Sequence, residues 1–373
     1  MTATFVPFEL ERWQSTWENR VRYNLSESGV HPLSIRELLK LSGGSVDALA
    51  DQKLVYSQSN GTPELRAAIA ALYPGATSEH VVATIGSAEA NFIVCWTLVQ
   101  RGDKVAIVTP TYMQTWGLTQ NLGATVAEIP LLEHKSWEPD SKRITEAILP
   151  GTRLVVLTNP NNPTGHNVSD EARQAIVARA NEVGAWLLLD EVYQGAERNG
   201  VTTTSLFGSY ERAIAVNGLS KAYGLPGLRI GWVVAPPAFA EQLWSRHDYT
   251  VIGPGPANDF LAQQALKVRD KIFARTRKIL NANYPVLEAW LKTFGNFFEW
   301  QAPDAGAICW VRYRHKHTAL EIVERVRKRA DILLCAGEHF GMPGYLRLGY
   351  GNERKELDEA LGALGTEFKA LIG

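Results

Sequence analysis

The stretch NGLSKAYGLPGLRIGW, residues 217–232, holds one lysine, Lys221, and one arginine, Arg229, eight residues later. Two glycines and a proline separate them, and these residue types favour turns over a continuous helix. The apolar run 230–234 that follows is typical of a buried strand. The stretch therefore predicts a lysine held in a tight turn beside a core strand.

The chemistry of this pair indicates a cofactor. We expect the pKa of Lys221 to be lowered, because burial disfavours the charged ammonium. A neutral amine is a nucleophile toward an aldehyde, and the guanidinium of Arg229 can bind a phosphate with two hydrogen bonds. Pyridoxal phosphate carries both an aldehyde and a phosphate, so the pair predicts this cofactor. From this stretch alone, a surface lysine and a structural arginine remain the alternative.

Composition limits the other possibilities. The chain has 373 residues, of which 45% are hydrophobic and 21% charged, with a formal net charge of −1. This length suits about two domains, and the dispersed basic residues indicate neither a nucleic acid nor a membrane surface as partner. The three cysteines, Cys95, Cys309 and Cys335, are widely spaced, which favours reduced thiols in the cytoplasm over disulfides or a metal site. The sequence contains no apolar run of membrane-spanning length.

Strand-like and helix-like segments alternate through the first two thirds of the chain. This order predicts a three-layer α/β/α arrangement, with helices on both faces of a mostly parallel sheet. Polar residues suited to chemistry follow the predicted strands, namely Ser87, Tyr112, Asn162, Asp190 and Lys221. Because ligands of such sheets bind at the carboxyl ends of the strands, we expect these residues to share one site.

The pattern changes near residue 236 and predicts three segments. Residues 1–44 form an N-terminal arm and part of a small domain, and residues 45–260 form the large cofactor-binding domain. Residues 261–373 form a connecting helix and a second, smaller α+β domain. The helical pattern of 257–290 and the strand-like runs FFEW and ICWVRY support this division.

Three motifs occur in order: NPNNPTG (159–165), DEVYQG (190–195) and SKAYGLPGLRIGW (220–232). With them, the sequence resembles the fold-type I pyridoxal-phosphate enzymes, the aspartate aminotransferase superfamily of class I and II, from about residue 25 to 351. The resemblance implies that Lys221 links covalently to the cofactor aldehyde and then moves protons at the substrate Cα.

The same resemblance assigns the residues around the cofactor ring. Asp190 would lie opposite the ring nitrogen and keep it protonated, so that the ring can accept electrons. Asn162 and Tyr193 would hydrogen-bond the phenolic oxygen, and Tyr112 would stack on the ring.

Phosphate binding is assigned by the resemblance to one group of residues: Gly86, Ser87, Ala88, Ser220, Arg229 and, from the neighbouring subunit, Tyr56. This last residue implies a homodimer or a dimer of dimers. One position departs from the pattern, because many relatives carry a serine three residues before the lysine and this chain carries Gly218. One phosphate contact is therefore in doubt, and Ser220 is expected to take a larger share.

For the substrate, the resemblance assigns Arg347 to the α-carboxylate, together with Asn162. The loop LSESGVHPLS, residues 25–34, contributes Glu27 and Gly29. This loop, with GSAEA and the lysine stretch, is similar to the capreomycidine synthase group. That similarity implies a guanidino amino acid as substrate, with Glu27 as the partner of the guanidinium.

The cofactor chemistry leaves the reaction open. The main hypothesis is an aminotransferase acting on an L-α-amino acid. The alternative is a β- or γ-elimination lyase or cyclase acting on a guanidino amino acid, either canavanine γ-lyase-like or capreomycidine-synthase-like. A racemase, a decarboxylative synthase and a non-catalytic binding module are further alternatives.

Overall fold

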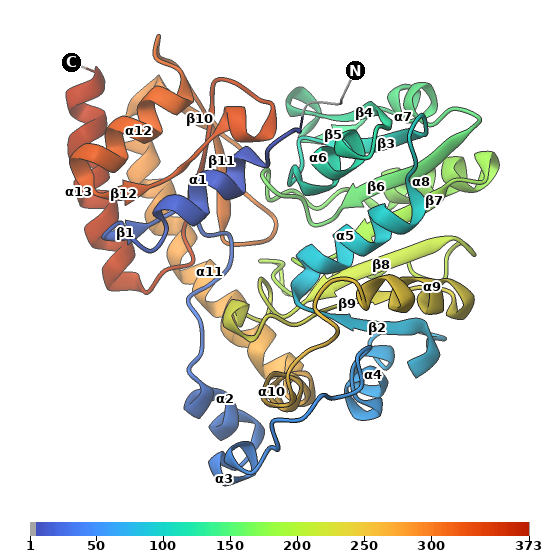
Figure 1. The fold of residues 1–373 in the computed structure, drawn as a ribbon. Helices are drawn as coiled ribbons and strands as arrows, with labels where there is room; N and C mark the ends of the chain where they lie inside the picture. The colour runs from blue at the N-terminus through green and yellow to red at the C-terminus, as the bar shows by residue number, and fades with distance from the viewer. Residues whose placement is uncertain (1–4, 373) are drawn as a thin grey trace.

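The computed structural model describes residues 5–372 and contains an eight-stranded sheet, which forms the core of its larger part (Figure 1). In sheet order its strands are β2 (Val81–Thr84), β9 (Gly231–Val234), β8 (Ala213–Gly218), β7 (Trp186–Asp190), β6 (Thr152–Thr158), β3 (Lys104–Thr109), β4 (Thr125–Leu132) and β5 (Glu138–Pro139). Strands β8, β7, β6, β3 and β4 pair in parallel, whereas β9 runs against both of its neighbours and β5 against β4. The predicted mostly parallel sheet is confirmed.

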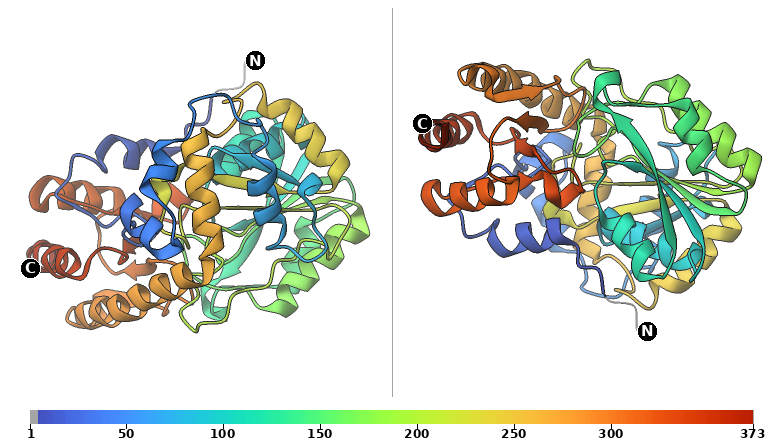
Figure 2. Two further views of the ribbon diagram at one scale, coloured as in Figure 1. Left: turned by 90° about the horizontal axis from the view of Figure 1, so that it is seen from below. Right: turned by 90° about the horizontal axis from the view of Figure 1, so that it is seen from above.

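Helices cover both faces of this sheet, so its central strands β6, β7 and β8 are buried on both sides. Val105 and Ile107 of β3 lie in one core, and Ala106 and Val108 lie in the opposite one. The first core is closed mainly by α5 (Gly86–Leu98), α6 (Gln114–Asn121) and α9 (Pro237–His247), and the second by α7 (Ser141–Ala147) and α8 (Asp170–Val183). Figure 2 shows the resulting three layers, which the sequence predicted.

A smaller antiparallel sheet has the order β10-β11-β14-β13. Its strands are β10 (Phe298–Trp300), β11 (Ile308–Tyr313), β14 (Tyr345–Gly349) and β13 (Cys335–Ala336), and nearby lie α12 (Ala319–Ala330) and α13 (Arg354–Ile372). The beginning of the chain joins this part, because β1 (Tyr23–Asn24) pairs in parallel with β12 (Ile332–Leu333). The helix α1 (Glu9–Trp17) precedes β1. The three segment boundaries given above stay a prediction.

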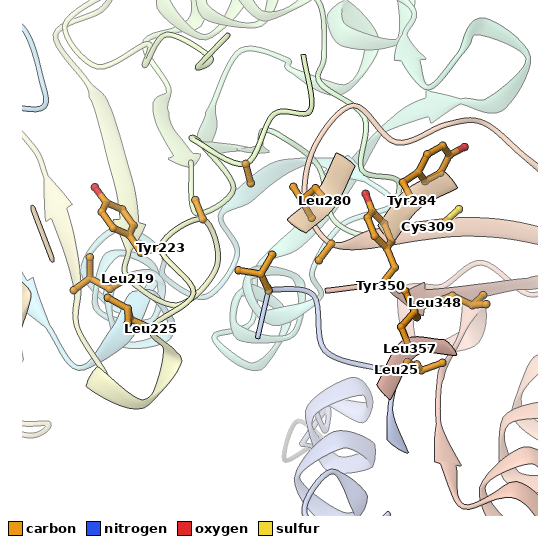
Figure 3. Close-up of a cluster of buried hydrophobic side chains, with 14 of the residues drawn as sticks. Leu25, Leu219, Tyr223, Leu225, Leu280, Tyr284, Cys309, Leu348, Tyr350 and Leu357 are labelled. Carbon is orange, nitrogen blue, oxygen red and sulfur yellow. The ribbon is translucent and has the colours of Figure 1, made fainter. Parts of the chain in front are cut away.

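The region expected to be mainly helical, 257–290, contains two helices that are separated at Val268: α10 (Pro256–Lys267) and α11 (Arg269–Lys292). Figure 3 shows a buried cluster near α11, with Leu219, Tyr223 and Leu225 beside the lysine turn and Leu348 and Tyr350 at the small sheet. On α11 the hydroxyl of Thr276 donates to the carbonyl of Ala222 at 2.8 Å, and the side-chain amide of Asn283 donates to the carbonyl of Tyr350 at 2.8 Å. One helix thus fixes the lysine turn relative to the small sheet.

The remaining helices are short: α2 (Ile35–Ser42), α3 (Val46–Ala50) and α4 (Pro63–Ala70). Helix α4 begins as its sequence predicts, with Pro63 at its first position and the side chain of Thr62 accepting from the amide of Leu65. Within residues 5–372, no helix combines the length and the apolar character needed to cross a membrane.

Candidate active site

A cavity of about 390 Å³ lies where the parallel strands end. Asp190 is the last residue of β7, and loops that follow β3, β6 and β8 carry Tyr112, Asn162 and Lys221. Because these strands run in one direction, their carboxyl ends meet at one edge of the sheet. The cavity brings together most residues singled out from the sequence: Glu27, Ser87, Ala88, Tyr112, Asn162, Asp190, Tyr193, Ser220, Lys221, Arg229 and Arg347.

Three residues named from the sequence do not line this cavity. Gly86 lies behind it, against the guanidinium of Arg229. Gly29 contributes its backbone, since its N–H donates to Oε1 of Glu27 at 2.9 Å. Tyr56 is 89% exposed and belongs to a loop outside the cavity of its own chain.

One end of the cavity has the form of an anion cradle. Helix α5 begins at Gly86, so the backbone N–H groups of its first turn, at Ser87 and Ala88, are available to an anion. Gly86 has φ +78°, and a Cβ there would lie 2.4 Å from Nη2 of Arg229. Only glycine lets the arginine lie directly against the start of the helix.

The departure at position 218 has a physical reason. A Cβ on Gly218 would lie 3.0 Å from the carbonyl oxygen of Ile230 and 3.6 Å from the backbone nitrogen of Ser87. The position is therefore close to β9 and to the cradle, with little room for a side chain. The preceding Asn217 uses its carbonyl Oδ1 to accept from the N–H of Gly218 at 2.7 Å, while Ser220 lines the cavity.

Asp190 is 5% exposed and held by two donors. The amide of Asn91 donates to its Oδ2 at 3.0 Å, and the N–H of Val192 donates to its Oδ1 at 3.3 Å. Burial raises the pKa of Asp190, and the two hydrogen bonds oppose that rise. Sequence reasoning missed Asn91. The available signal was a polar residue on α5 among the apolar Ala90, Ile93 and Val94.

Lys221 is paired with Glu27. Its Nζ lies 2.8 Å from Oε1 of Glu27, which also accepts from the N–H groups of Ser28 and Gly29. Burial by itself lowers the pKa of Lys221, but the charge and hydrogen bond of Glu27, together with Tyr193, outweigh this effect, and the pKa is raised. The expected lowering is therefore wrong for this arrangement. Burial opposes ionisation of Glu27 as well, yet Lys221 and the two backbone donors bring its pKa down to about 2.

Two tyrosines from the predicted set face the cavity and are held by hydrogen bonds. The hydroxyl of Tyr193 donates to Oγ of Ser28 at 2.8 Å, and that of Tyr112 donates to Oε1 of Glu11 at 2.6 Å. Burial raises the pKa of both phenols, so both hydroxyls stay protonated near neutral pH.

Arg347 of β14 is 2% exposed and only partly satisfied. Its Nη1 donates to Oδ1 of Asn162 at 2.7 Å, and its Nη2 donates to the carbonyl of Ser26 at 2.5 Å and contacts Sγ of Cys335 at 3.2 Å. Its Nε has no partner among the residues that the structure describes. A buried guanidinium that lines a cavity and keeps one donor without a partner is suited to a carboxylate ligand.

The residues present fit pyridoxal phosphate. The cradle of Gly86 and Arg229 suits its phosphate, Asp190 suits its ring nitrogen, and Lys221 lies in the same cavity. The volume is in the usual range for a small-molecule site. Asn91 and Arg347 each retain a buried polar atom without a partner in the described part of the chain, as expected where a ligand completes the hydrogen bonding.

Helix α1 supplies a wall that sequence reasoning missed. Glu11, Gln14 and Glu18 line the cavity and come from one helical face and its C-terminal end. The spacing i, i+3, i+7 was the signal available in the sequence. Because Leu10 of α1 is fully buried and Trp13 donates to the carbonyl of Leu334 at 2.8 Å, this face is held toward the cavity.

Comparisons with known proteins agree with this geometry. The sequence pattern of the family described as aminotransferase class I and II matches residues 38–364. The chain is 28% identical to capreomycidine synthase of Streptomyces vinaceus, over 96% of this chain and 92% of that protein. It is 26% identical to arginine–pyruvate transaminase of Pseudomonas aeruginosa, over 88% and 86%. A pyridoxal-phosphate-dependent aminotransferase from Streptococcus suis superposes with a TM-score of 0.93 and 31% identity, over 99% of both chains.

Proposed function

The chain belongs to the aminotransferase class I and II family, and we propose that its cavity is where it transfers the amino group of an L-α-amino acid. It is a pyridoxal-phosphate-dependent enzyme that acts on amino acids. The observation that carries the proposal is the arrangement within one cavity. Lys221 and Asp190 line the same cavity as Arg229, at the phosphate cradle, and the buried guanidinium of Arg347.

We assign the proton-handling roles to two residues. When bound, pyridoxal phosphate supplies an electron sink that makes the bonds at the substrate Cα labile. The amine of Lys221 holds the cofactor covalently and moves a proton at the substrate Cα. The carboxylate of Asp190 holds a proton on the ring nitrogen, and its burial beside Asn91 supports this role.

The other residues bind and orient. Arg347 binds the substrate carboxylate through its buried guanidinium, whose Nε has no partner among the described residues. Tyr193 and Asn162 would hold the cofactor by donating to its phenolic oxygen, and Tyr112 would stack on its ring. The phosphate is held by the first turn of α5 and by two further residues, Ser220 and Arg229.

Replacement of one amine tests the assignment. We expect Lys221→Ala to lose the visible absorption of the lysine-bound cofactor and to lower turnover at least about a thousandfold, because both the covalent link and the proton carrier are removed. Lys142→Ala is the matched control, because Lys142 lies on α7 and its side chain is 81% exposed. A Lys221→Ala protein that kept the band and the activity would overturn the proposal.

A second candidate is an elimination or cyclisation on a guanidino amino acid. The similarity to capreomycidine synthase over most of both chains favours it. The similarity to arginine–pyruvate transaminase supports the same substrate class with transfer as the reaction.

The two reactions differ in their need for an acceptor. Arginine, canavanine and neutral amino acids would be incubated with the enzyme, with and without pyruvate or 2-oxoglutarate. Product formation that requires the oxo acid supports transfer. Release of ammonia, or of hydroxyguanidine from canavanine, without an oxo acid supports elimination.

We also propose a cytoplasmic homodimer, or a dimer of dimers, in which Tyr56 reaches the phosphate in the neighbouring subunit. The neighbouring exposed side chains of Leu54, Val55 and Tyr56 support this proposal. Mixing inactive Lys221→Ala and Tyr56→Ala chains should restore part of the activity, because one site of each mixed dimer then has both residues. Light scattering would give the mass, and a monomer would rule the arrangement out.

A further inference from the structure

The acidic face of α1 has no cation to balance it. Glu11 and Glu18 line the cavity, yet no lysine, arginine or histidine among residues 5–372 forms an ion pair with either carboxylate. Glu11 accepts one hydrogen bond, from the hydroxyl of Tyr112, and the side chain of Glu18 accepts none from the described residues. Carboxylates that share a cavity without a counter-ion repel one another.

The mutual effect of these groups is visible at Glu18. Burial raises its pKa, and the charges of Glu27 and Glu11 raise it further, whereas Lys221 lowers it. All three carboxylates line the same cavity, so their fields add inside it. A cation placed there would be attracted to all three.

The cations already in the cavity have other tasks if the proposed function holds. Arg229 lies at the phosphate cradle, and Arg347 is committed to the substrate carboxylate. Lys221 is the only described cation that pairs with one of these acids, and its amine is the group that holds the cofactor. No positive charge is left for the α1 wall.

We propose that α1 is the element that selects the substrate, with Glu11 and Glu18 binding the cationic end of an amino-acid side chain of the guanidinium type. The buried, unpartnered Nε of Arg347 in the same cavity fixes the other end of such a substrate through its carboxylate. This inference rests on the proposed function. It adds the residues that discriminate a charged side chain from a neutral one of the same shape.

Two unreactive probes separate charge from shape. The compound 5-guanidinopentanoate has the carboxylate and guanidinium of arginine but no α-amino group, and 5-ureidopentanoate is its neutral counterpart. Binding of each to the cofactor-loaded enzyme would be measured by isothermal titration calorimetry. We expect the guanidino compound to bind at least about tenfold more tightly, because charge-assisted hydrogen bonds are available to it alone.

Variants of α1 assign the effect. Glu11→Gln and Glu18→Gln should each reduce the guanidino-to-ureido preference several-fold, and the double variant should bring it close to one. Glu9→Gln is the matched control, because Glu9 lies on the same helix but is exposed and outside the cavity. Equal affinity of the wild-type enzyme for both probes, or equal loss for both probes in the variants, would overturn the inference.

The failure of the proposed function would look different. A protein that did not retain pyridoxal phosphate would contradict the assignment of the whole site. A protein that retained it, and converted neutral amino acids as well as arginine, would contradict only the role of α1.

Discussion

At the scale of single residues, Glu27 controls the charge of Lys221. The two side chains are 2.8 Å apart, and the carboxylate raises the pKa of the amine despite its burial. Since only the neutral amine attacks an aldehyde, the pair keeps the cofactor-free protein in a less reactive form at neutral pH.

We therefore expect Glu27→Gln to lower the pKa of Lys221 and to speed attachment of pyridoxal phosphate to the cofactor-free protein. The rate of appearance of the visible band, followed against pH, should rise several-fold near neutrality, and its profile should move to lower pH. Glu64→Gln, at an exposed site on α4, should leave the profile in place. An unchanged profile for Glu27→Gln would show that the pairing does not govern the amine.

Asn91 performs a comparable task for Asp190. Burial raises the pKa of Asp190, and the amide of Asn91 donates to the charged form and lowers it. Removing this donor in Asn91→Leu should raise that pKa further, because the charged carboxylate loses a hydrogen bond that favours it. Activity requires the charged carboxylate. As the solution is acidified, the variant should therefore lose activity at a higher pH than the wild-type enzyme.

Two quantities would be measured in the variant: the pH profile of kcat and the affinity for pyridoxal phosphate. The affinity should fall first at low pH. Gln114→Ala is the control, because Gln114 contacts Asn91 but not Asp190. If both variants shift the acidic limb equally, the effect comes from general loosening of α5.

At the scale of elements, the start of α5 and the turn after β8 form one unit. Gly86 begins the helix with a positive φ, and the guanidinium of Arg229 lies against the position that a Cβ on Gly86 would occupy. The motif order in the sequence predicted that both bind phosphate. The contact between them depends on β2 and β8 both pairing with β9, which no local pattern specifies.

Gly86→Ala tests this unit. We expect it to weaken pyridoxal phosphate binding at least about tenfold, because the new methyl group displaces the guanidinium of Arg229. The positive φ should add about 1 kcal/mol of lost stability. Gly102→Ala has a similar φ of +89° but open space around its Cβ, so it should lose stability without losing cofactor. Equilibrium dialysis and thermal unfolding give the two quantities, and comparable cofactor loss in both variants would refute the displacement.

At the scale of the whole molecule, His166 joins the large sheet to the small one. Its Nε2 lies 2.9 Å from Glu138 of β5, and its Nδ1 lies 2.9 Å from Asp304 in the loop between β10 and β11. Burial by itself lowers the pKa of His166, but hydrogen bonds to the two carboxylates outweigh it and raise the pKa.

A raised pKa in the folded state stabilises the fold below the ordinary pKa of histidine, near 6.5, and this gain is lost as the pH rises through the folded-state value. We therefore expect His166→Asn to lower Tm by several degrees at pH 6 and by much less at pH 9. His134→Gln, at an exposed position without an ion pair among the described residues, should change Tm little at either pH. Equal losses for His166→Asn at both values would mean that its charge is irrelevant.

The sequence by itself determined the order of strands and helices, the lysine turn and the residues that follow each strand. These depend on local preferences: apolar runs, turn-forming glycine and proline, and the direction of parallel strands. Only the tertiary structure decided that Glu27 pairs with Lys221, that Asn91 supports Asp190, and that α1 places Glu11 and Glu18 at the cavity. Those contacts join residues far apart along the chain, and their energies depend on distance and burial, which no single segment of sequence encodes.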